Sequence, residues 1–225
     1  MKSIKTALLS TVALLLLGFS TSFAGTVNWA AATDNGLANA NGVKLPAGSL
    51  LLVGAFDITD AVIQANAANV AFLTSHFTQY GSSTIGTNVG GLPGFFFQSS
   101  IGNFDTTTPF PVGGLSIYIW AFNAATMGAA TQQGIFSQTV DSDWIFPHDI
   151  DIITTKTIDL TDLTNGAGTA LIAGADIVIG NFQQGAGNTL DFNLAPIPEP
   201  SAYALAVLGG IVLLFVRRRS VNLRT

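Results

Sequence analysis

The chain has 225 residues, no cysteine and a formal net charge of −5. Two lysines and all thirteen acidic residues lie between residues 25 and 200, which gives this part a net charge of −11 (2 − 13) and no arginine. Phosphate binding needs Lys and Arg, so the composition excludes nucleic-acid binding. Without disulfides, stability must come from a buried core, and the chain is long enough for one such domain.

The first residues have the pattern of a secretory signal peptide. Lys2 and Lys5 give a positive start, residues 7–19 are mostly apolar, and the small residues Ser22 and Ala24 fit a cleavage site. We therefore predict a signal peptide over residues 1–24 that is cleaved after Ala24.

The body, residues 25–195, consists mainly of short apolar runs separated by Gly, Asn and Asp, which is typical of strands and turns. The clearest strand is 115–122, with one aliphatic and one aromatic face. Further strands are expected at 27–31, 49–56, 95–97, 135–136, 144–146, 169–179 and 189–194. The sequence predicts a mainly β fold, a single secreted antiparallel β-sandwich or jelly-roll-like domain.

One helix is expected inside this β domain. Ile63, Ala67, Val70, Leu73 and Phe77 recur at intervals of three or four residues, which places them on one helix face. The spacing predicts one short helix over about 58–79.

The last part, residues 196–225, has the layout of a processing signal. A proline-rich motif, Pro198-Glu199-Pro200, precedes an uncharged stretch at 202–216 and the basic cluster Arg217-Arg218-Arg219. We predict a hydrophobic helix over 202–216, shorter than the roughly 20 apolar residues that span a bilayer comfortably. The arginines act as a stop and favour an orientation with the body outside and the tail inside.

This tripartite tail resembles the PEP-CTERM sorting signal of Gram-negative bacteria. The resemblance implies recognition by an exosortase after export through the secretion machinery by way of the signal peptide. It also implies transient single-pass anchoring in the inner membrane, cleavage near Pro198-Glu199-Pro200, and delivery to the cell surface or extracellular matrix of a biofilm-forming species that makes exopolysaccharide. Retention of the tail as a permanent anchor is the alternative.

Parts of the body are similar to uncharacterised PEP-CTERM proteins of the Verrucomicrobia type. The segments that carry this similarity are 45–50, 118–123 and 144–147. The resemblance implies one folded module and brings no activity with it.

Few residues of the body are suited to catalysis. It has no cysteine or arginine, its one glutamate is Glu199, and its two histidines, His76 and His148, are isolated in the sequence. We expect no catalytic residues and a non-enzymatic protein. A glycosidase that uses two aspartates is the least implausible enzyme.

Four aspartates surround the segment 144–147: Asp141, Asp143, Asp149 and Asp151. Carboxylates are hard oxygen ligands of the kind that Ca²⁺ prefers. No EF-hand spacing is present, so these residues are interpreted either as acidic turns or as calcium ligands. No other metal or cofactor is expected.

Tyr118, Trp120 and Phe122 alternate along the strand 115–122 and therefore share one face. They are interpreted either as core residues or as a platform that stacks sugar rings. Two functions thus remain open: a structural or adhesive surface protein, and a carbohydrate-binding, lectin-like module with exopolysaccharide as its partner.

Overall fold

The computed structural model describes residues 24–31, 35–151, 155–184 and 190–198. Within these ranges the fold is mainly β, as predicted, and most strand pairs are antiparallel. No helix in the described ranges is long and apolar enough to cross a bilayer. Most of the predicted signal peptide and the predicted helix 202–216 lie outside the described residues.

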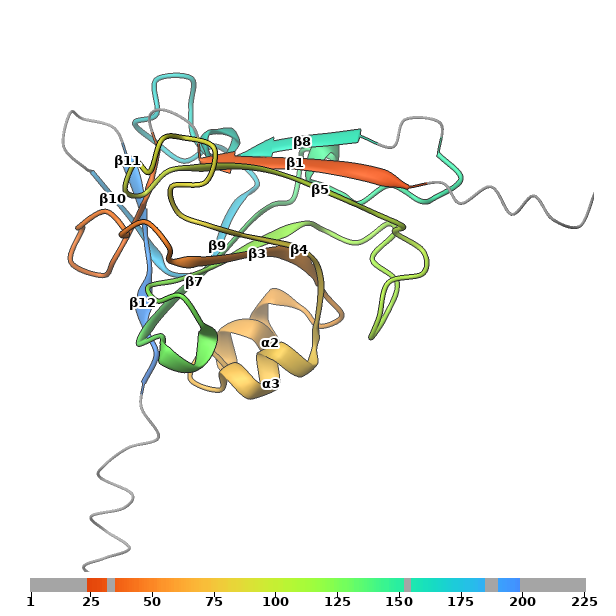
Figure 1. Ribbon diagram of the computed structural model, residues 1–225, viewed down its shortest axis with the longest axis horizontal. Coiled ribbons are helices and arrows are strands. Elements are labelled where there is room, and N and C mark those ends of the chain that lie inside the picture. The colour runs from red at the N-terminus through yellow and green to blue at the C-terminus, as the bar shows by residue number, and fades with distance from the viewer. Residues whose placement is uncertain (1–23, 32–34, 152–154, 185–189, 199–225) are drawn as a thin grey trace, which may run out of the picture.

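The largest sheet has six strands and forms the middle layer of the fold (Figure 1). Its order is β12 (Ala195–Pro196), β7 (Gln132–Gln138), β6 (Tyr118–Phe122), β3 (Leu50–Phe56) and β4 (Phe77–Thr84), and β9 (Ala175–Ile179) pairs with β7. The two central strands, β3 and β6, are apolar on both faces because both faces are covered.

A second sheet lies over one face of the first (Figure 1). It has the order β5 (Phe96–Gly102), β1 (Gly25–Ala31) and β8 (Thr155–Asp159). Along β1, Val27 and Trp29 point into the core, whereas Thr26 and Asn28 are only half-buried. This alternation is what a sheet with one solvated face requires.

A third, small sheet closes one end of the molecule. It consists of β10 (Asn181–Gln184), β11 (Leu190–Asn193) and β2 (Leu37–Ala38). The main core lies between the two larger sheets, and its members include Trp29, Val53, Ile119 and Phe136.

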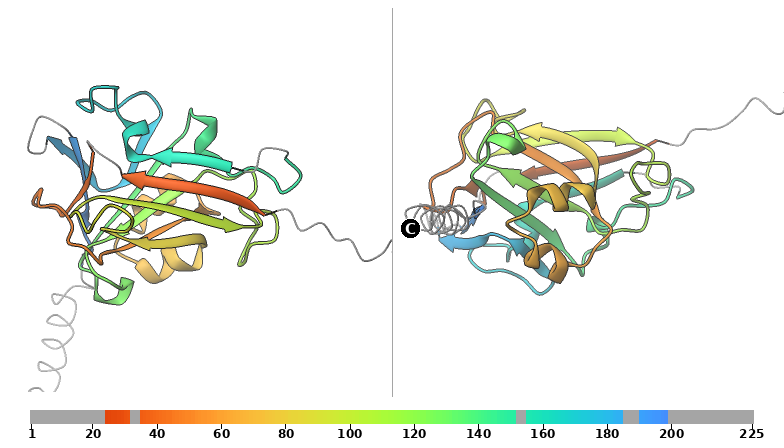
Figure 2. Two further views of the ribbon diagram at one scale, coloured as in Figure 1. Left: turned by 45° about the horizontal axis from the view of Figure 1, so that its top comes forward. Right: turned by 90° about the horizontal axis from the view of Figure 1, so that it is seen from below.

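The other face of the six-stranded sheet is covered by two short helices (Figures 1 and 2). They are α2 (Asp60–Ala65) and α3 (Val70–Ser75), so the prediction of one helix over about 58–79 is wrong in its extent. The first helix ends at Asn66, and Asn69 caps the second by accepting a hydrogen bond from the backbone N–H of Phe72 at 3.1 Å.

Phe77, the last residue of the predicted helix face, belongs to β4 instead, where it pairs with Phe56 of β3. A side chain of the sheet supports the break between the helices, because Gln133 of β7 donates a hydrogen bond to the carbonyl oxygen of Ala67 at 2.6 Å. The apolar spacing is thus shared by two helices and the start of a strand.

Other expected elements also differ. The segment 144–146 is not a strand: Trp144 closes a 3-10 turn, η2 (Ser142–Trp144), and Ile145 makes one isolated bridge to Ser116. Two more such turns are η1 (Met127–Ala129) and η3 (Leu160–Leu163). Strands β2, β4, β8, β10 and β12 were not predicted, and the expected strands 115–122 and 169–179 are confirmed only from Tyr118 and Ala175 onward.

Candidate functional site

The outward side of the β5-β1-β8 sheet is the most distinctive surface of the described chain. We call it the neutral face because Asp159, at one corner, is the one charged side chain among its described positions. These positions are Thr26, Asn28, Ala30, Phe97, Ser99, Ile101, Thr155, Thr157 and Asp159. In Figure 2, left, no helix or strand crosses these three strands. Phe97 and Ile101 are 43% and 71% exposed.

Strand register arranges the neutral face in rows. One row joins Ser99, Asn28 and Thr157 across the three strands. The Ser99 hydroxyl donates to Asn28 Oδ1, and Asn28 Nδ2 donates to the Thr157 hydroxyl at 3.3 Å. These bonds hold the Asn28 amide in the plane of the sheet, so the row presents fixed hydroxyl and amide groups to solvent.

The predicted aromatic platform does not lie on the surface. Tyr118, Trp120 and Phe122 are 8%, 0% and 0% exposed, because they face α2 and α3 on the covered side of the six-stranded sheet. Their interpretation as core residues is confirmed, and their interpretation as a sugar-stacking platform is wrong.

A cluster of polar side chains joins two loops at the edge of the β layers. The His148 Nδ1 atom lies 2.8 Å from Asp105 Oδ1, and the second Asp105 oxygen accepts the Asp149 backbone N–H at 2.8 Å. Asp149 in turn accepts the backbone N–H groups of Phe104 at 2.6 Å and Asp105 at 3.2 Å. Each loop therefore satisfies backbone donors of the other, which is a structural role.

This pairing shifts both partners' pKa values. The hydrogen bond with Asp105, and then its charge, raise the pKa of His148. Burial raises the pKa of Asp105, but hydrogen bonds from Asp149 and His148 and the charge of His148 outweigh it, so the net shift is downward. The partner of the His148 ring is a carboxylate, and its Nε2 side packs against Gly114.

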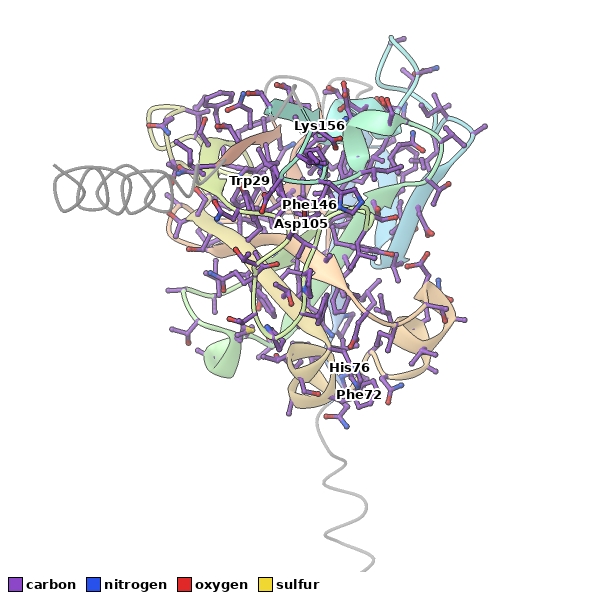
Figure 3. All side chains as sticks on the ribbon, turned by 90° about the vertical axis from the view of Figure 1, so that its right-hand side faces the viewer. Trp29, Phe72, His76, Asp105, Phe146 and Lys156 are labelled. Carbon is purple, nitrogen blue, oxygen red and sulfur yellow. The ribbon has the colours of Figure 1, made fainter. Side chains whose placement is uncertain are left out.

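An open groove of about 860 Å³ lies beside this cluster, with Ile145, Phe146 and Ile150 among its apolar lining. Figure 3 shows Phe146 close to Asp105, with Lys156 farther along the same side. Lys156 Nζ is already held by the Ser142 carbonyl oxygen at 2.8 Å and by the Asp143 carboxylate at 3.5 Å. The one lysine among the described residues that line the groove is therefore already paired.

The four aspartates considered as calcium ligands are engaged separately. Asp141 caps η2 by accepting the Asp143 N–H at 2.8 Å, and Asp151 accepts the His148 N–H at 2.7 Å. Asp143 pairs with Lys156, and Asp149 holds the loop at Phe104. Among the described residues, no three acidic or histidine side chains converge on one point.

Titration calorimetry of the full-length chain with Ca²⁺ distinguishes the two interpretations of these aspartates, acidic turns or calcium ligands. We expect no saturable heat at millimolar calcium, because backbone N–H groups and Lys156 occupy these carboxylates. Saturable heat that Asp149→Asn abolishes would contradict this expectation.

A pair of carboxyl groups, those of Asp60 and Asp176, lies between the helix layer and the sheet. The Tyr118 hydroxyl donates to Asp60 Oδ1 at 2.8 Å, and Asp176 of β9 hydrogen-bonds with Asp60. At the C-terminal end of α3, the His76 ring pairs with Asp57 at 2.8 Å and lies tilted against the Phe72 ring (Figure 3).

The predicted processing residues fall at the ends of the described chain. Ala24 is exposed and directly precedes β1, and Pro198 is exposed two residues after β12. Glu199, Pro200 and the arginines 217–219 lie outside the described residues.

The sequence did not predict the neutral face, the His148–Asp105 pair or the Asp60–Asp176 pair. The polar alternation of residues 26–28 and 155–157 was the only available signal, and it does not reveal that these strands are neighbours. Comparison with family models, with curated proteins and with solved structures finds no match for this chain.

Proposed function

We propose that this chain is an exported protein of the cell surface or extracellular matrix with a non-catalytic, structural or adhesive role. In this proposal the signal peptide brings the chain to the secretion machinery, and the tail holds it briefly in the inner membrane. An exosortase then cleaves near Pro198-Glu199-Pro200 and releases a β-sandwich-type domain into a layer of exopolysaccharide.

One observation carries the proposal: both predicted processing positions flank the β domain without interrupting it. The first strand begins at Gly25, one residue after Ala24, and the last strand ends at Pro196. Ala24 and Pro198 are exposed, as peptide bonds that a protease attacks must be. Cleavage at either position would leave every hydrogen bond of the described sheets in place.

Intact-mass spectrometry of the protein isolated from the cells that make it tests this proposal. We expect an N-terminus at Gly25 and loss of residues 202–225, because both processing steps remove segments outside the β domain. Glu199→Ala should keep the tail, whereas the matched change Asn222→Ala, beyond the basic cluster, should be processed normally. A mature protein that still carries Arg217 would contradict exosortase processing.

A further inference from the structure

We propose that the neutral face binds an uncharged, extended polysaccharide chain. This proposal rests on the proposed function, because it names the partner to which an exported matrix protein would adhere. The carbohydrate contact then lies around Phe97, on the solvated side of the fold opposite the buried Trp120.

The distribution of charge indicates which kind of polymer the neutral face can bind. The segment 25–200 has a net charge of −11, yet the first two rows of the neutral face contain no charged side chain. The third row runs from Phe97 through Ala30 to Asp159, and the Asp159 carboxylate caps η3 by accepting the Thr161 N–H at 2.8 Å. An anionic polymer would be repelled by the remaining surface, whereas a neutral polymer meets a neutral strip without that cost.

The chemistry of the face also fits sugars. Hydroxyl and amide groups of Ser99, Asn28 and Thr157 both donate and accept hydrogen bonds, as sugar hydroxyls do. Phe97 lies on the same face and exposes 43% of its surface, which provides a ring for stacking on the apolar side of a pyranose. Neighbouring strands are about 4.8 Å apart, so the row forms a flat strip that suits an extended chain.

A second copy of this chain is a poorer occupant. Phe97 and Ile101 are the exposed large hydrophobic side chains of the neutral face. A stable protein interface buries about 800 Å² per partner around a packed apolar centre. Two separated apolar side chains among hydroxyl groups do not form such a centre.

Binding is tested with the full-length chain purified in detergent. We expect retention on insoluble cellulose or chitin and no retardation by polygalacturonate, which is anionic. Phe97→Ala should weaken binding about tenfold through loss of stacking, and Thr157→Lys should weaken it at least as much, because it removes the hydroxyl that accepts from Asn28 and places a longer side chain in the row. The matched control is Val140→Ala, which truncates a side chain that is 69% exposed and lies outside the neutral face; its binding should equal that of the unmodified chain.

Several results would overturn the proposal: no retention on either neutral polymer, retention that Phe97→Ala leaves unchanged, or preference for polygalacturonate. Sedimentation provides a further check, because a dimer that Thr157→Lys dissociates would assign the face to a second copy. Melting temperatures show whether each variant is folded. Correct processing without polysaccharide binding would defeat this inference alone, and an unprocessed tail would defeat the proposed function alone.

Discussion

Replacement of Trp120 by alanine is expected to lower the free energy of unfolding by about 3–5 kcal/mol, the usual loss for a fully buried aromatic side chain. The indole is 0% exposed and contacts three other rings, with centroids 5.5 Å from Phe56, 5.2 Å from Phe77 and 5.1 Å from Phe122. The ring therefore joins β3, β4 and β6 beneath the helix layer, and its removal leaves a cavity that these strands cannot fill without moving.

Part of the expected loss of stability comes from a hydrogen bond that Trp120 makes. Trp120 Nε1 donates to Gln133 Oε1 at 3.0 Å, and Gln133 Nε2 donates to the Ala67 carbonyl between the helices. Gln133 is 1% exposed, so the loss of the indole leaves its oxygen buried without this donor, at a cost of about 1–3 kcal/mol. Trp120→Phe separates the two contributions, because it keeps an aromatic ring and removes the N–H donor.

Urea denaturation of the full-length chain, followed by circular dichroism, measures both variants. Phe72→Ala is the matched control. Phe72 is an aromatic residue of α3 that is only partly buried, and its ring centroid lies 4.5 Å from that of His76. Its loss should be clearly smaller than that of Trp120→Ala. Equal losses for the two variants, or an unchanged midpoint for Trp120→Ala, would show that Trp120 does not hold the helices on the sheet.

Continuous apolar runs predicted strands β3 and β6 well, because strands covered on both faces need apolar residues at every position. The helix prediction failed at its ends for a related reason. Phe77 satisfies the helical spacing of Ile63 and Leu73, yet the same residue also fills a buried position opposite Phe56 in β4. Periodicity alone does not distinguish one long helix from two short helices followed by a strand. The caps at Asn66 and Asn69, which end the first helix and begin the second, make the difference.

The candidate site was beyond sequence reasoning for a topological reason. The hydrogen bonds of the central row join Asn28 to Ser99, 71 residues away, and to Thr157, 129 residues away. Each strand alone has ordinary polar residues at alternate positions, and only their pairing makes a continuous face with Asp159 at one corner as its charged side chain. Tyr118, Trp120 and Phe122 were correctly placed on one side of a strand, but the helices that cover that side lie about fifty residues earlier in the chain.

Stability is expected to fall as the pH rises from about 4 to about 7. Over this range Asp176 has already lost its proton in the unfolded chain, and it loses its proton in the folded chain only as the pH passes about 6. Burial, a hydrogen bond with Asp60 and the charge of Asp60 raise the pKa of Asp176 from 3.8 to about 6. Tyr118 donates to the same Asp60 carboxylate, so the proton on Asp176 completes a link between β9, α2 and β6.

The direction of this change in stability follows from the number of protons that the folded and unfolded chains bind. Between about pH 4 and pH 6 the folded chain retains a proton on Asp176 that the unfolded chain has lost, so unfolding releases a proton and a rise in pH favours it. The contribution to stability is complete below the unfolded pKa and is lost as the pH passes the folded value of about 6. A shift of this size corresponds to about 3 kcal/mol, which solvent screening of a half-exposed pair reduces to about 1 kcal/mol.

Asp176→Asn is expected to remove this contribution to the pH dependence, because an amide donates to Asp60 at every pH and carries no charge. In urea titrations the variant should match the unmodified chain near pH 4.5 and exceed it by about 1 kcal/mol at pH 8. Asp143→Asn, at a carboxylate that is 56% exposed, controls for the change in net charge and should leave the slope unaltered.

The difference in stability between the variant and the unmodified chain is the informative quantity, because other groups act in the same direction. Burial raises the pKa of Asp162, which both proteins also retain. Asp105 raises the pKa of His148, so that histidine's contribution is present below its unfolded pKa and is also lost as the pH rises. Both proteins retain His148, and subtraction removes it. If the two chains lose stability in parallel from pH 4.5 to pH 8, the proton between Asp176 and Asp60 does not fasten α2 to β9. If they diverge, hydrogen exchange of the α2 amides at pH 8 should be faster in the unmodified chain than in Asp176→Asn, because like charges then face each other where the helix meets the strand.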